Sequence, residues 1–217
     1  MSLNTLERKF AHRLDRIDSC TADFSTNHFN PARCDPEAWK YLEGLLSSLW
    51  QYWGHFCRCL IIESSLGCQT ASGAVLASVV VPPIWERVSY LSAQSKQKCP
   101  KYLPGVTNSI LRFEPTWGDV NSLSKVVSAI KPGNQAQLLA AFGSAQKVIH
   151  LQKVRNAAAH RNTETMTEVM KFSPLYNLQE APRHPVEAAF WIDPTSNLFA
   201  IESWTDEMRV IANLAVQ

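Results

Sequence analysis

Apolar side chains recur every three or four residues along much of the chain, which is the spacing of amphipathic α-helices. The clearest stripe lies in residues 3–18 and consists of Leu3, Leu6, Phe10, Leu14 and Ile17. Residues 36–65 are apolar on nearly every side of a helical projection, with Trp, Leu, Phe and Ile at most turns. A helix that is hydrophobic all round is buried. The pattern therefore predicts an amphipathic first helix and a central, buried second helix.

Turn-forming residues mark the limits of these two helices. Residues 19–35 are polar and contain Asn-Pro and Asp-Pro pairs, so we expect a loop there. Asp35 is the expected N-cap of the second helix, with Pro36 in its first turn. Gly67 is expected to end that helix, because glycine adopts the left-handed C-terminal turn without strain.

Residues 67–118 separate the central helix from the next strongly periodic stretch, and we interpret them as an insertion between core helices. Within the insertion, residues 71–81 fit either a helix or a strand, and residues 83–94 predict a short helix. A turn is expected over 115–118.

Two helices are predicted after the insertion. Asp119 is the expected cap of a helix that ends near residue 130, where Lys131-Pro132-Gly133 stops it. Residues 134–160 predict one long helix with a broad buried side. Residues 162–173 fit either more helix or a break.

The pattern of apolar and polar residues changes in the last part of the chain. Residues 185–204 contain two apolar runs around the polar turn Asp193–Asn197, which predicts a small β-hairpin. A final helix is expected to follow, with Ser203 or Thr205 as its N-cap. The whole pattern predicts a mainly α protein that forms a single domain over residues 1–217.

Charge is unevenly distributed, although the net charge is only +2. Residues 120–163 contain no Asp or Glu, and their basic residues are Lys125, Lys131, Lys147, Lys153, Arg155 and Arg161. A one-signed stretch of this length suggests an anionic partner. Residues 87–113 also lack acids, and their basic loops fit either the edge of a nucleic-acid groove or a solvated surface.

The acid-free stretch contains the residues best suited to chemistry, in the sequence Arg155-Asn156-Ala-Ala-Ala-His160. Arginine holds a phosphate by two parallel hydrogen bonds and keeps its charge. Histidine takes or gives a proton near neutral pH. The small alanines leave room for a large ligand to approach. Lys153 and Arg161 add positive charge beside the pair.

This motif resembles that of the HEPN superfamily, in which an Arg followed by a polar residue precedes a His by a few positions. The run Arg-Asn-Ala-Ala-Ala-His-Arg-Asn at 155–162 is similar to the common bacterial form. The resemblance implies a HEPN-like helical bundle, usually a homodimer, and in many members a metal-independent ribonuclease of toxin–antitoxin, phage-defence or RNA-processing systems. A C-terminal hairpin is not part of the minimal bundle of this family.

Helix geometry constrains how such a site is assembled. Five residues of α-helix turn through about 500°, so Arg155 and His160 would lie about 140° apart and would not share a face. A helix that ends near His160, or a two-fold dimer that brings two copies of the motif to one groove, would resolve this. The alternative is a solvated surface Arg and a His that interacts with the last carbonyl groups of the helix.

On the ribonuclease interpretation, a ribose 2′-hydroxyl attacks the neighbouring phosphodiester. His160 is the expected general base or acid, Arg155 stabilises the charge on the phosphate, and Asn156 orients His160 or the phosphate. Substrate-binding roles are expected for Lys153, Arg161 and Asn162. Glu63 either positions Arg155 or is an ordinary charged residue near a helix end. No metal or cofactor is expected.

Two other functions fit the same residues. One is an RNA- or nucleotide-binding module without cleavage, and the other is a partner-binding protein such as one half of a toxin–antitoxin pair, with an antitoxin protein as its partner. The six cysteines form no Cys-x-x-Cys pair, which favours reduced thiols in a cytoplasmic protein. No signal peptide is evident, and the most apolar runs are too short to cross a membrane.

Overall fold

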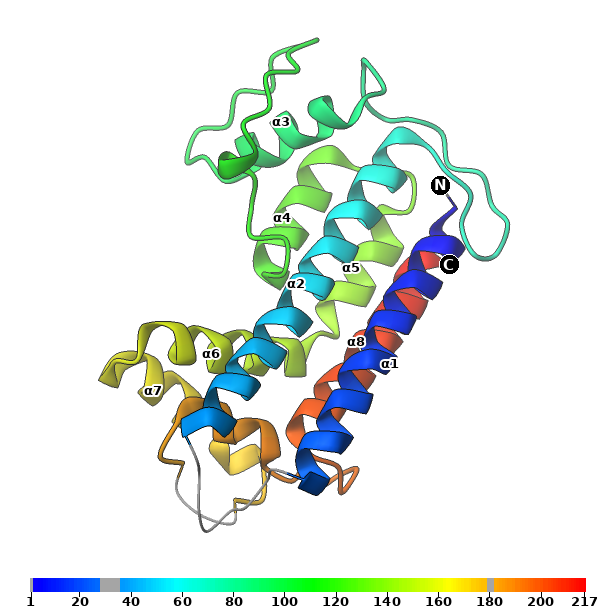
Figure 1. Cartoon of the computed structure of the whole chain (residues 1–217). Helices are drawn as coiled ribbons and strands as arrows, with labels where there is room; N and C mark the ends of the chain where they lie inside the picture. The colour runs from blue at the N-terminus through cyan, green and yellow to red at the C-terminus, as the bar shows by residue number, and fades with distance from the viewer. Residues whose placement is uncertain (1, 28–35, 179–181) are drawn as a thin grey trace. The chain divides into compact units, whose positions relative to one another are not determined.

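The computed structural model describes residues 2–27, 36–178 and 182–217 (Figure 1). Within these ranges the chain is mainly helical and contains no sheet, so the predicted mainly α class is confirmed. The contacts divide the chain into two compact units. Unit 1 comprises Met1–Ala11, Trp53–Ala145 and Val210–Gln217, and unit 2 comprises His12–Tyr52 and Gln146–Arg209. The single domain over 1–217 stays a prediction, and each unit is described by itself.

The first helix, α1, spans Leu3–Asn27 and is longer than predicted. The expected stripe is buried, but it continues through Thr21 and Phe24, which are also buried. The Thr21 hydroxyl donates to the Ile17 carbonyl at 2.9 Å, so this polar residue stays within the helix. The predicted loop was therefore wrong for residues 19–27. Its remainder, 28–35, including the expected Asp35 cap, lies outside the described residues.

The second helix, α2, spans Pro36–Leu66 and is lined with buried apolar residues, as predicted. Gly67 ends it with a φ of +94°, and its N–H donates to the Glu63 carbonyl at 3.1 Å. A Cβ atom at Gly67 would lie 2.9 Å from the Ser78 backbone nitrogen. Both the conformation and the close approach therefore require glycine there.

Unit 1 continues with helix α3 (Trp85–Ser95), the short 3₁₀ turn η1 (Leu111–Phe113) and helix α4 (Val120–Ile130). Residues 71–81 form neither of the two expected elements, and their only described bridge pairs Gln69 with Val75.

Helix α4 begins and ends at the residues that the sequence predicted. The Asp119 carboxylate accepts from the Ser122 N–H at 2.6 Å, and Lys131 leaves the helix with a φ of 58°.

The predicted long helix over 134–160 was wrong, because the structure has α5 (Gln135–Gly143) and α6 (Gln146–His160). At the break, the Ser144 hydroxyl donates to the Ala141 carbonyl at 2.7 Å. The Glu207 carboxylate accepts from the backbone N–H groups of Lys147 at 2.7 Å and Val148 at 2.8 Å. A carboxylate on N-terminal N–H groups starts a new helix. Periodicity missed the break because Glu207 is distant in the sequence.

The predicted β-hairpin over 185–204 was also wrong. Its first run forms the 3₁₀ helix η3 (Pro185–Phe190), and its second run leads into α8 (Ala200–Val216). Only an isolated bridge joins Ile192 to Phe199, whereas a hairpin needs a ladder of pairs. Pro185 fits the first turn of a helix, and the Glu187 carboxylate accepts from the Arg183 N–H at 2.6 Å.

The last helix begins earlier than expected, at Ala200 rather than near Ser203 or Thr205. The Glu202 carboxylate accepts from the Phe199 N–H at 2.9 Å and thereby satisfies a donor at this end of the helix. The two remaining elements of unit 2 are α7 (Thr163–Met170) and the 3₁₀ turn η2 (Ser173–Leu175).

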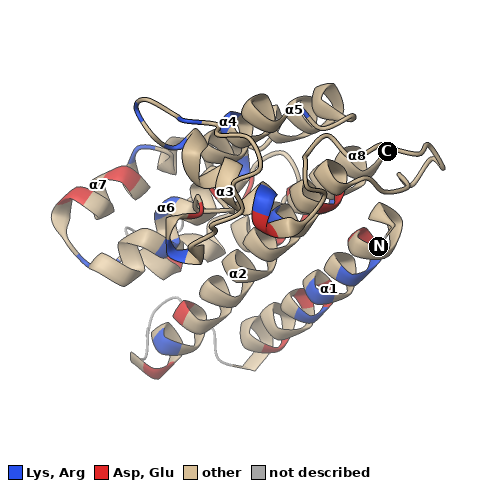
Figure 2. Ribbon diagram, turned by 90° about the horizontal axis from the view of Figure 1, so that it is seen from above, with Lys and Arg blue, Asp and Glu red and all other residues tan. Residues whose placement is uncertain are grey.

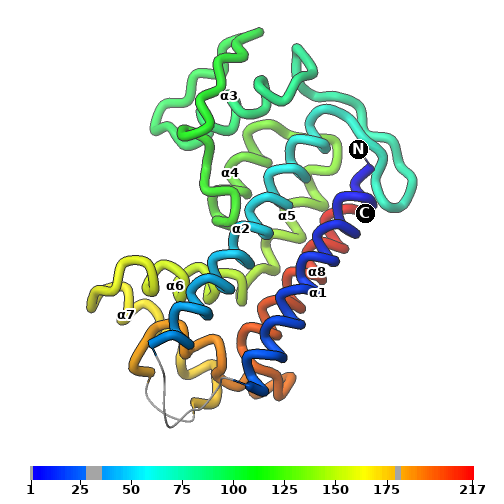
Figure 3. The backbone as a smooth tube through the Cα atoms, in the orientation of Figure 1, coloured from blue at the N-terminus to red at the C-terminus, as the bar shows by residue number. Residues whose placement is uncertain are grey.

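In unit 2 the later part of α1 lies beside the first part of α8 (Figures 1 and 3). In unit 2, Arg209 of α8 binds Asp18 and, at 3.0 Å, Asp15 of α1. In unit 1, the N–H of Leu3 donates to the Gln69 carbonyl at 3.0 Å.

Aromatic rings pack against one another in the core of unit 1. Phe10 stacks on Phe56 with ring centroids 4.5 Å apart, and Trp53 meets Phe142 edge-on. The Trp53 ring nitrogen donates to the Gly118 carbonyl at 3.1 Å, so the buried indole is satisfied. No helix in the described ranges is long and apolar enough to span a bilayer.

The cap of α6 yields a test of stability. Glu207→Ala is expected to lower the free energy of unfolding by about 0.5–2 kcal/mol, the usual range for loss of a helix cap. Glu207→Gln should cost less, because an amide oxygen still accepts a hydrogen bond. Urea unfolding followed by circular dichroism measures the change, with Glu164→Ala as a control at an exposed glutamate. Equal stability of Glu207→Ala and wild type would contradict the capping role.

Candidate functional site

Helix α6 positions the motif, and it stays regular throughout it. Leu151, Val154 and Ala157 are fully buried and fix the rotation of the helix. The helix ends at His160, and Arg161 follows in the left-handed region with a φ of 41°. The expectation that the helix ends at His160 is met. Because the helix is continuous from Arg155 to this end, the two motif side chains still point about 140° apart.

Arg155 is half-buried and borders a small hollow of about 180 Å³ in unit 2. Its Nη1 atom donates to the Asn156 side-chain oxygen at 3.3 Å, so the neighbouring amide orients the guanidinium. The remaining lining residues come from α2 and from the alanines of the motif: Glu43, Leu46, Ser47, Ala158 and Ala159. Two of the three alanines therefore border open space, as their small size suggested.

His160 is exposed in the last turn of α6. Within the part of the chain that the structure describes, its ring has neither a hydrogen bond nor an ion pair. An imidazole at this position is accessible to a ligand and can exchange protons with solvent.

The basic residues of unit 2 are partly neutralised by acids from distant parts of the sequence. Lys147 binds Asp193 at 2.5 Å, Lys153 lies 3.3 Å from Glu168, and Arg161 binds Glu43 at 2.5 Å. Figure 2 shows these mixed signs, with acidic segments on α7 as well as basic ones on α6. The acid-free sequence is therefore not an unopposed positive surface.

Arg155 differs from these three cations. Among the described residues no carboxylate lies within ion-pair distance of its guanidinium, and its one hydrogen bond joins it to the neutral amide of Asn156. Of the four cations on and just after α6, Arg155 is thus the one whose charge is not already matched by a described acid.

The Asp193 carboxylate is a structural anchor. It accepts hydrogen bonds from Lys147, from Ser203 at 2.6 Å, and from the N–H and hydroxyl of Thr195 at 2.9 and 2.6 Å. Burial alone would raise the pKa of Asp193, but these hydrogen bonds outweigh it and hold the pKa below its usual value. Lys147 is therefore committed to the fold of unit 2.

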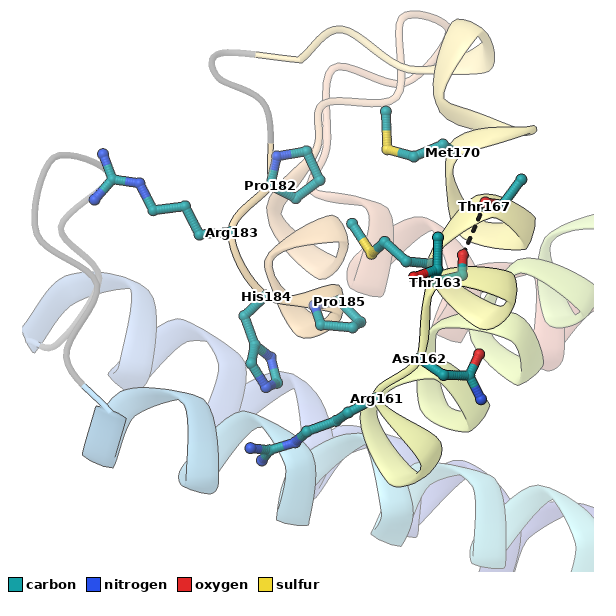
Figure 4. Close-up of a pocket in the computed structure, with 10 residues that line it drawn as sticks. Arg161, Asn162, Thr163, Thr167, Met170, Pro182, Arg183, His184 and Pro185 are labelled. Atoms are coloured by element: carbon teal, nitrogen blue, oxygen red, sulfur yellow. Dashed lines mark hydrogen bonds between the residues drawn. The ribbon is translucent and has the colours of Figure 1, made fainter.

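A larger cavity of about 510 Å³ opens directly after the motif, also within unit 2 (Figure 4). This volume lies in the range of small-molecule sites. One wall is a face of α7, and the other is the segment 182–185. The lining residues are Arg161, Asn162, Thr163, Met166, Thr167, Met170, Pro182, Arg183, His184 and Pro185, with no carboxylate among them.

Glu43 lies between the cavity and the Arg155 hollow. Its Oε1 atom accepts from Arg161 and lies 3.3 Å from His184 Nε2. Figure 4 shows Arg161 and His184 reaching toward α2, which carries Glu43, while Arg183 extends away. One carboxylate therefore faces side chains of both hollows.

His184 is held in a fixed orientation. Its ring stacks on Trp39 with centroids 4.8 Å apart, and its Nδ1 atom accepts from the Val186 N–H at 3.4 Å. Burial, and then the charge of Arg161, lower the pKa of His184 against the opposing effects of Glu43 and Glu187. The lowered pKa favours the neutral ring, and Nε2 lies 3.3 Å from Glu43 without making a hydrogen bond to any described residue.

The other predicted substrate-binding residues have structural partners. The Asn162 side chain caps α7 by accepting a hydrogen bond from the Thr165 N–H at 2.8 Å, and Asn162 also lines the cavity. Glu63 belongs to unit 1, where it is half-buried and contributes, after burial, to a raised pKa of Cys68. The suggested role of Glu63 in positioning Arg155 remains untested.

His150 is a half-buried residue that the sequence reasoning did not single out. Its Nδ1 atom lies 2.9 Å from the Tyr176 hydroxyl, which accepts from the Trp204 ring nitrogen at 3.0 Å. The imidazole stacks on Phe172 with centroids 4.3 Å apart. Burial and the nearby cations lower the pKa of His150 to about 4. No local signal links His150 to partners this far along the chain.

Comparison of the chain with protein-family models, with curated proteins and with solved structures found no match. The five described cysteines form no disulfide with one another, and Cys34 lies outside the described residues. No cluster of three or more metal-ligating side chains occurs in the described ranges.

The low pKa of His150 predicts a pH dependence of stability. Because the folded-state pKa is lowered, folding opposes protonation, so stability falls as the pH drops from about 6.5 towards 4. The loss at pH 4 should be about 1–3 kcal/mol after allowance for partial exposure of the ring. Urea unfolding at pH 7 and pH 4 measures it, and His150→Gln should flatten the dependence, whereas His12→Gln at an exposed histidine should not. An NMR titration giving His150 a pKa near 6.5 would contradict the argument.

Proposed function

We propose that the protein is a metal-independent endoribonuclease of the HEPN type. The observation that carries the proposal is the state of the motif at the end of α6. Arg155 has no carboxylate partner among the described residues, Asn156 orients its guanidinium, and His160 is exposed in the last helical turn. A cation that no described carboxylate neutralises can stabilise charge on a phosphate, and an accessible imidazole can transfer a proton in phosphodiester cleavage.

The proposed reaction is an internal transfer of the phosphoryl group. A general base removes the proton of a ribose 2′-hydroxyl, whose oxygen attacks the adjacent phosphorus. The bond to the 5′-oxygen of the next nucleotide breaks, and that oxygen receives a proton. The products are a 2′,3′-cyclic phosphate and a 5′-hydroxyl. His160 transfers a proton, and Arg155 stabilises the charge that grows on the phosphate oxygens.

The reaction needs both groups at one phosphate, and one copy of α6 does not bring them there. A two-fold dimer satisfies the requirement, because Arg155 of one chain can then face His160 of the other. Closed two-fold dimers are the commonest oligomers of soluble proteins. The proposal therefore includes a homodimer with two composite sites.

The cavity after His160 is the proposed binding place for RNA next to the cut. It follows the motif directly in the chain, and its lining residues include no acid. Met166, Met170 and Pro182 offer apolar surface for a base, and Thr163 and Asn162 offer polar groups at the rim. Toxin or defence activity, an antitoxin partner and a cytoplasmic location stay expectations from the family resemblance.

The separation of Arg155 and His160 favours a second candidate, an RNA-binding module without cleavage. A single chain that presents the two side chains on different helical faces can hold two phosphates without reacting with either. Both candidates predict RNA affinity, and only the first predicts a loss of cleavage when His160 alone is replaced.

Replacement of the motif residues tests the proposal. His160→Ala is expected to reduce cleavage of single-stranded RNA by roughly 10²–10⁴-fold, the usual contribution of positioned proton transfer. Arg155→Ala should be similarly damaging, and Arg155→Lys should restore little, because lysine lacks the planar pair of donors. The measurement is gel analysis of labelled RNA in EDTA, with Lys125→Ala as an exposed-cation control.

The same assay identifies the product ends. RNA with a 2′-O-methyl group at the cut site should resist cleavage, and the 5′ fragment should end in a 2′,3′-cyclic phosphate. Undiminished cleavage by His160→Ala would overturn the catalytic assignment. Tight RNA binding without cleavage by the wild-type protein would favour the binding module instead.

A further inference from the structure

Exposed apolar side chains are concentrated in one segment of unit 1. Of the large apolar residues that are exposed in the described part of the chain, ten lie between Val75 and Phe113 and five lie elsewhere. The group around α3 and η1, here called the Trp85 surface, consists of Ile84, Trp85, Ile110, Leu111 and Phe113. Leu111 is 60% exposed and Phe113 50% exposed. Clustered exposure of this kind marks interaction sites on soluble proteins.

Internal hydrogen bonds hold the backbone near this surface in place. The Arg87 guanidinium is buried and donates to the carbonyl groups of Leu103 at 2.7 Å and Val106 at 2.8 Å. The Tyr90 hydroxyl donates to the Lys101 carbonyl at 2.6 Å. In Figure 3 the segment after α3 accordingly runs beside that helix before it reaches α4. The apolar side chains are thus presented by an anchored loop.

A hollow of about 450 Å³ lies within the Trp85 surface, with Trp85 and Leu111 on its walls and Arg58 and Glu114 beside them. Arg58 binds Glu114 through two hydrogen bonds of 2.8 and 2.9 Å. The Trp117 ring nitrogen also donates to Glu114 at 2.7 Å. The Arg58 guanidinium lies 5.6 Å from the centre of the Trp85 ring and restrains it. A preformed hollow beside a restrained tryptophan is suited to an apolar anchor residue.

The charge around the Trp85 surface is mainly positive. Residues 84–114 contain two acids, and Arg58 already neutralises one of them, Glu114. Of the five basic residues in this range, Arg87 and Lys96 donate to backbone carbonyl groups of the fold. The other three have no carboxylate partner among the described residues, and they are Lys98, Lys101 and Arg112.

We propose that the Trp85 surface binds a protein segment that carries both apolar and acidic side chains. Apolar anchors fill the hollow beside Trp85, and carboxylates pair with Lys98, Lys101 and Arg112. RNA fits this surface less well, because Ile84, Ile110 and Leu111 offer neither donors for phosphates nor rings for base stacking. Aromatic and arginine side chains at the centre with charges at the rim are typical of protein interfaces.

Selection of peptides on the intact protein tests this assignment. A displayed library of random 12-residue peptides is selected on the wild type in the presence of excess RNA. The enriched peptides are expected to combine Asp or Glu with Leu, Ile, Phe or Trp. Leu111→Asp should weaken their binding by about 10-fold or more, as loss of a central contact does. The double variant Lys98→Glu, Lys101→Glu should also weaken peptide binding, because its new carboxylates repel those of the peptide. This loss of binding should grow as the salt concentration is lowered.

Val210→Asp is the matched control, because Val210 is 58% exposed in α8 of the same unit. It should leave peptide binding unchanged, and circular dichroism should show that all variants fold. The proposal is overturned if no peptide is enriched, if the enriched peptides lack acids, or if Leu111→Asp binds them as well as the wild type does.

Two further measurements exclude other occupants. If Leu111→Asp turns a larger species into a smaller one in sedimentation velocity, a second copy of this chain covers the surface. If Leu111→Asp loses binding to phosphatidylserine vesicles, a membrane covers the surface. If the variant loses binding to RNA, a nucleic acid covers it. Either result would overturn the proposal. Unchanged sedimentation, vesicle binding and RNA binding together with lost peptide binding would support it.

Discussion

The proposed chemistry depends on one geometric constraint, which is that α6 remains helical from Arg155 to His160. Buried Val154 and Ala157 hold the helix at a fixed rotation, so the two motif side chains leave it in different directions. Neither residue can move to the other without unwinding the last turn. A reaction that needs both groups at one phosphate therefore needs a second chain, and this is why dimerisation belongs to the proposed mechanism.

The second determinant is the pairing of charges over long distances in the sequence. Asp193 holds Lys147, Glu168 lies beside Lys153, and Glu43 holds Arg161. Among the described residues these acids leave the charge of Arg155 unmatched, which is why Arg155 is the proposed phosphate-binding cation of α6.

The sequence predicted what depends on local rules. The buried course of α2, its end at Gly67, the cap Asp119 and the end of the motif helix at His160 all follow from periodicity, caps and turn residues. The missed features depend on distant partners. The break before α6 depends on Glu207, and the 3₁₀ helix after Pro185 depends on Glu187. The two runs of the predicted hairpin share one described bridge, between Ile192 and Phe199.

The residues of the candidate site divide in the same way into those that local sequence patterns predict and those that depend on distant partners. Arg155, Asn156 and His160 could be found because their residue types and spacing carry the signal. Three contacts could not be found, because each joins residues with no common sequence pattern. They are the pairing of Arg161 with Glu43, the stacking of His184 on Trp39 and the contact of His150 with Tyr176. The acid-free stretch was misleading for this reason, since its neutralising acids lie outside it.

The most direct test of a composite site is activity from two inactive variants in one dimer. Arg155→Ala and His160→Ala chains with different affinity tags are co-expressed, and the mixed dimer is isolated through both tags. It contains one site with both wild-type groups, so it should cleave RNA at about half the wild-type rate, while each variant alone stays inactive. A mixed dimer no more active than the single variants, or failure of the two chains to co-purify, would contradict the account.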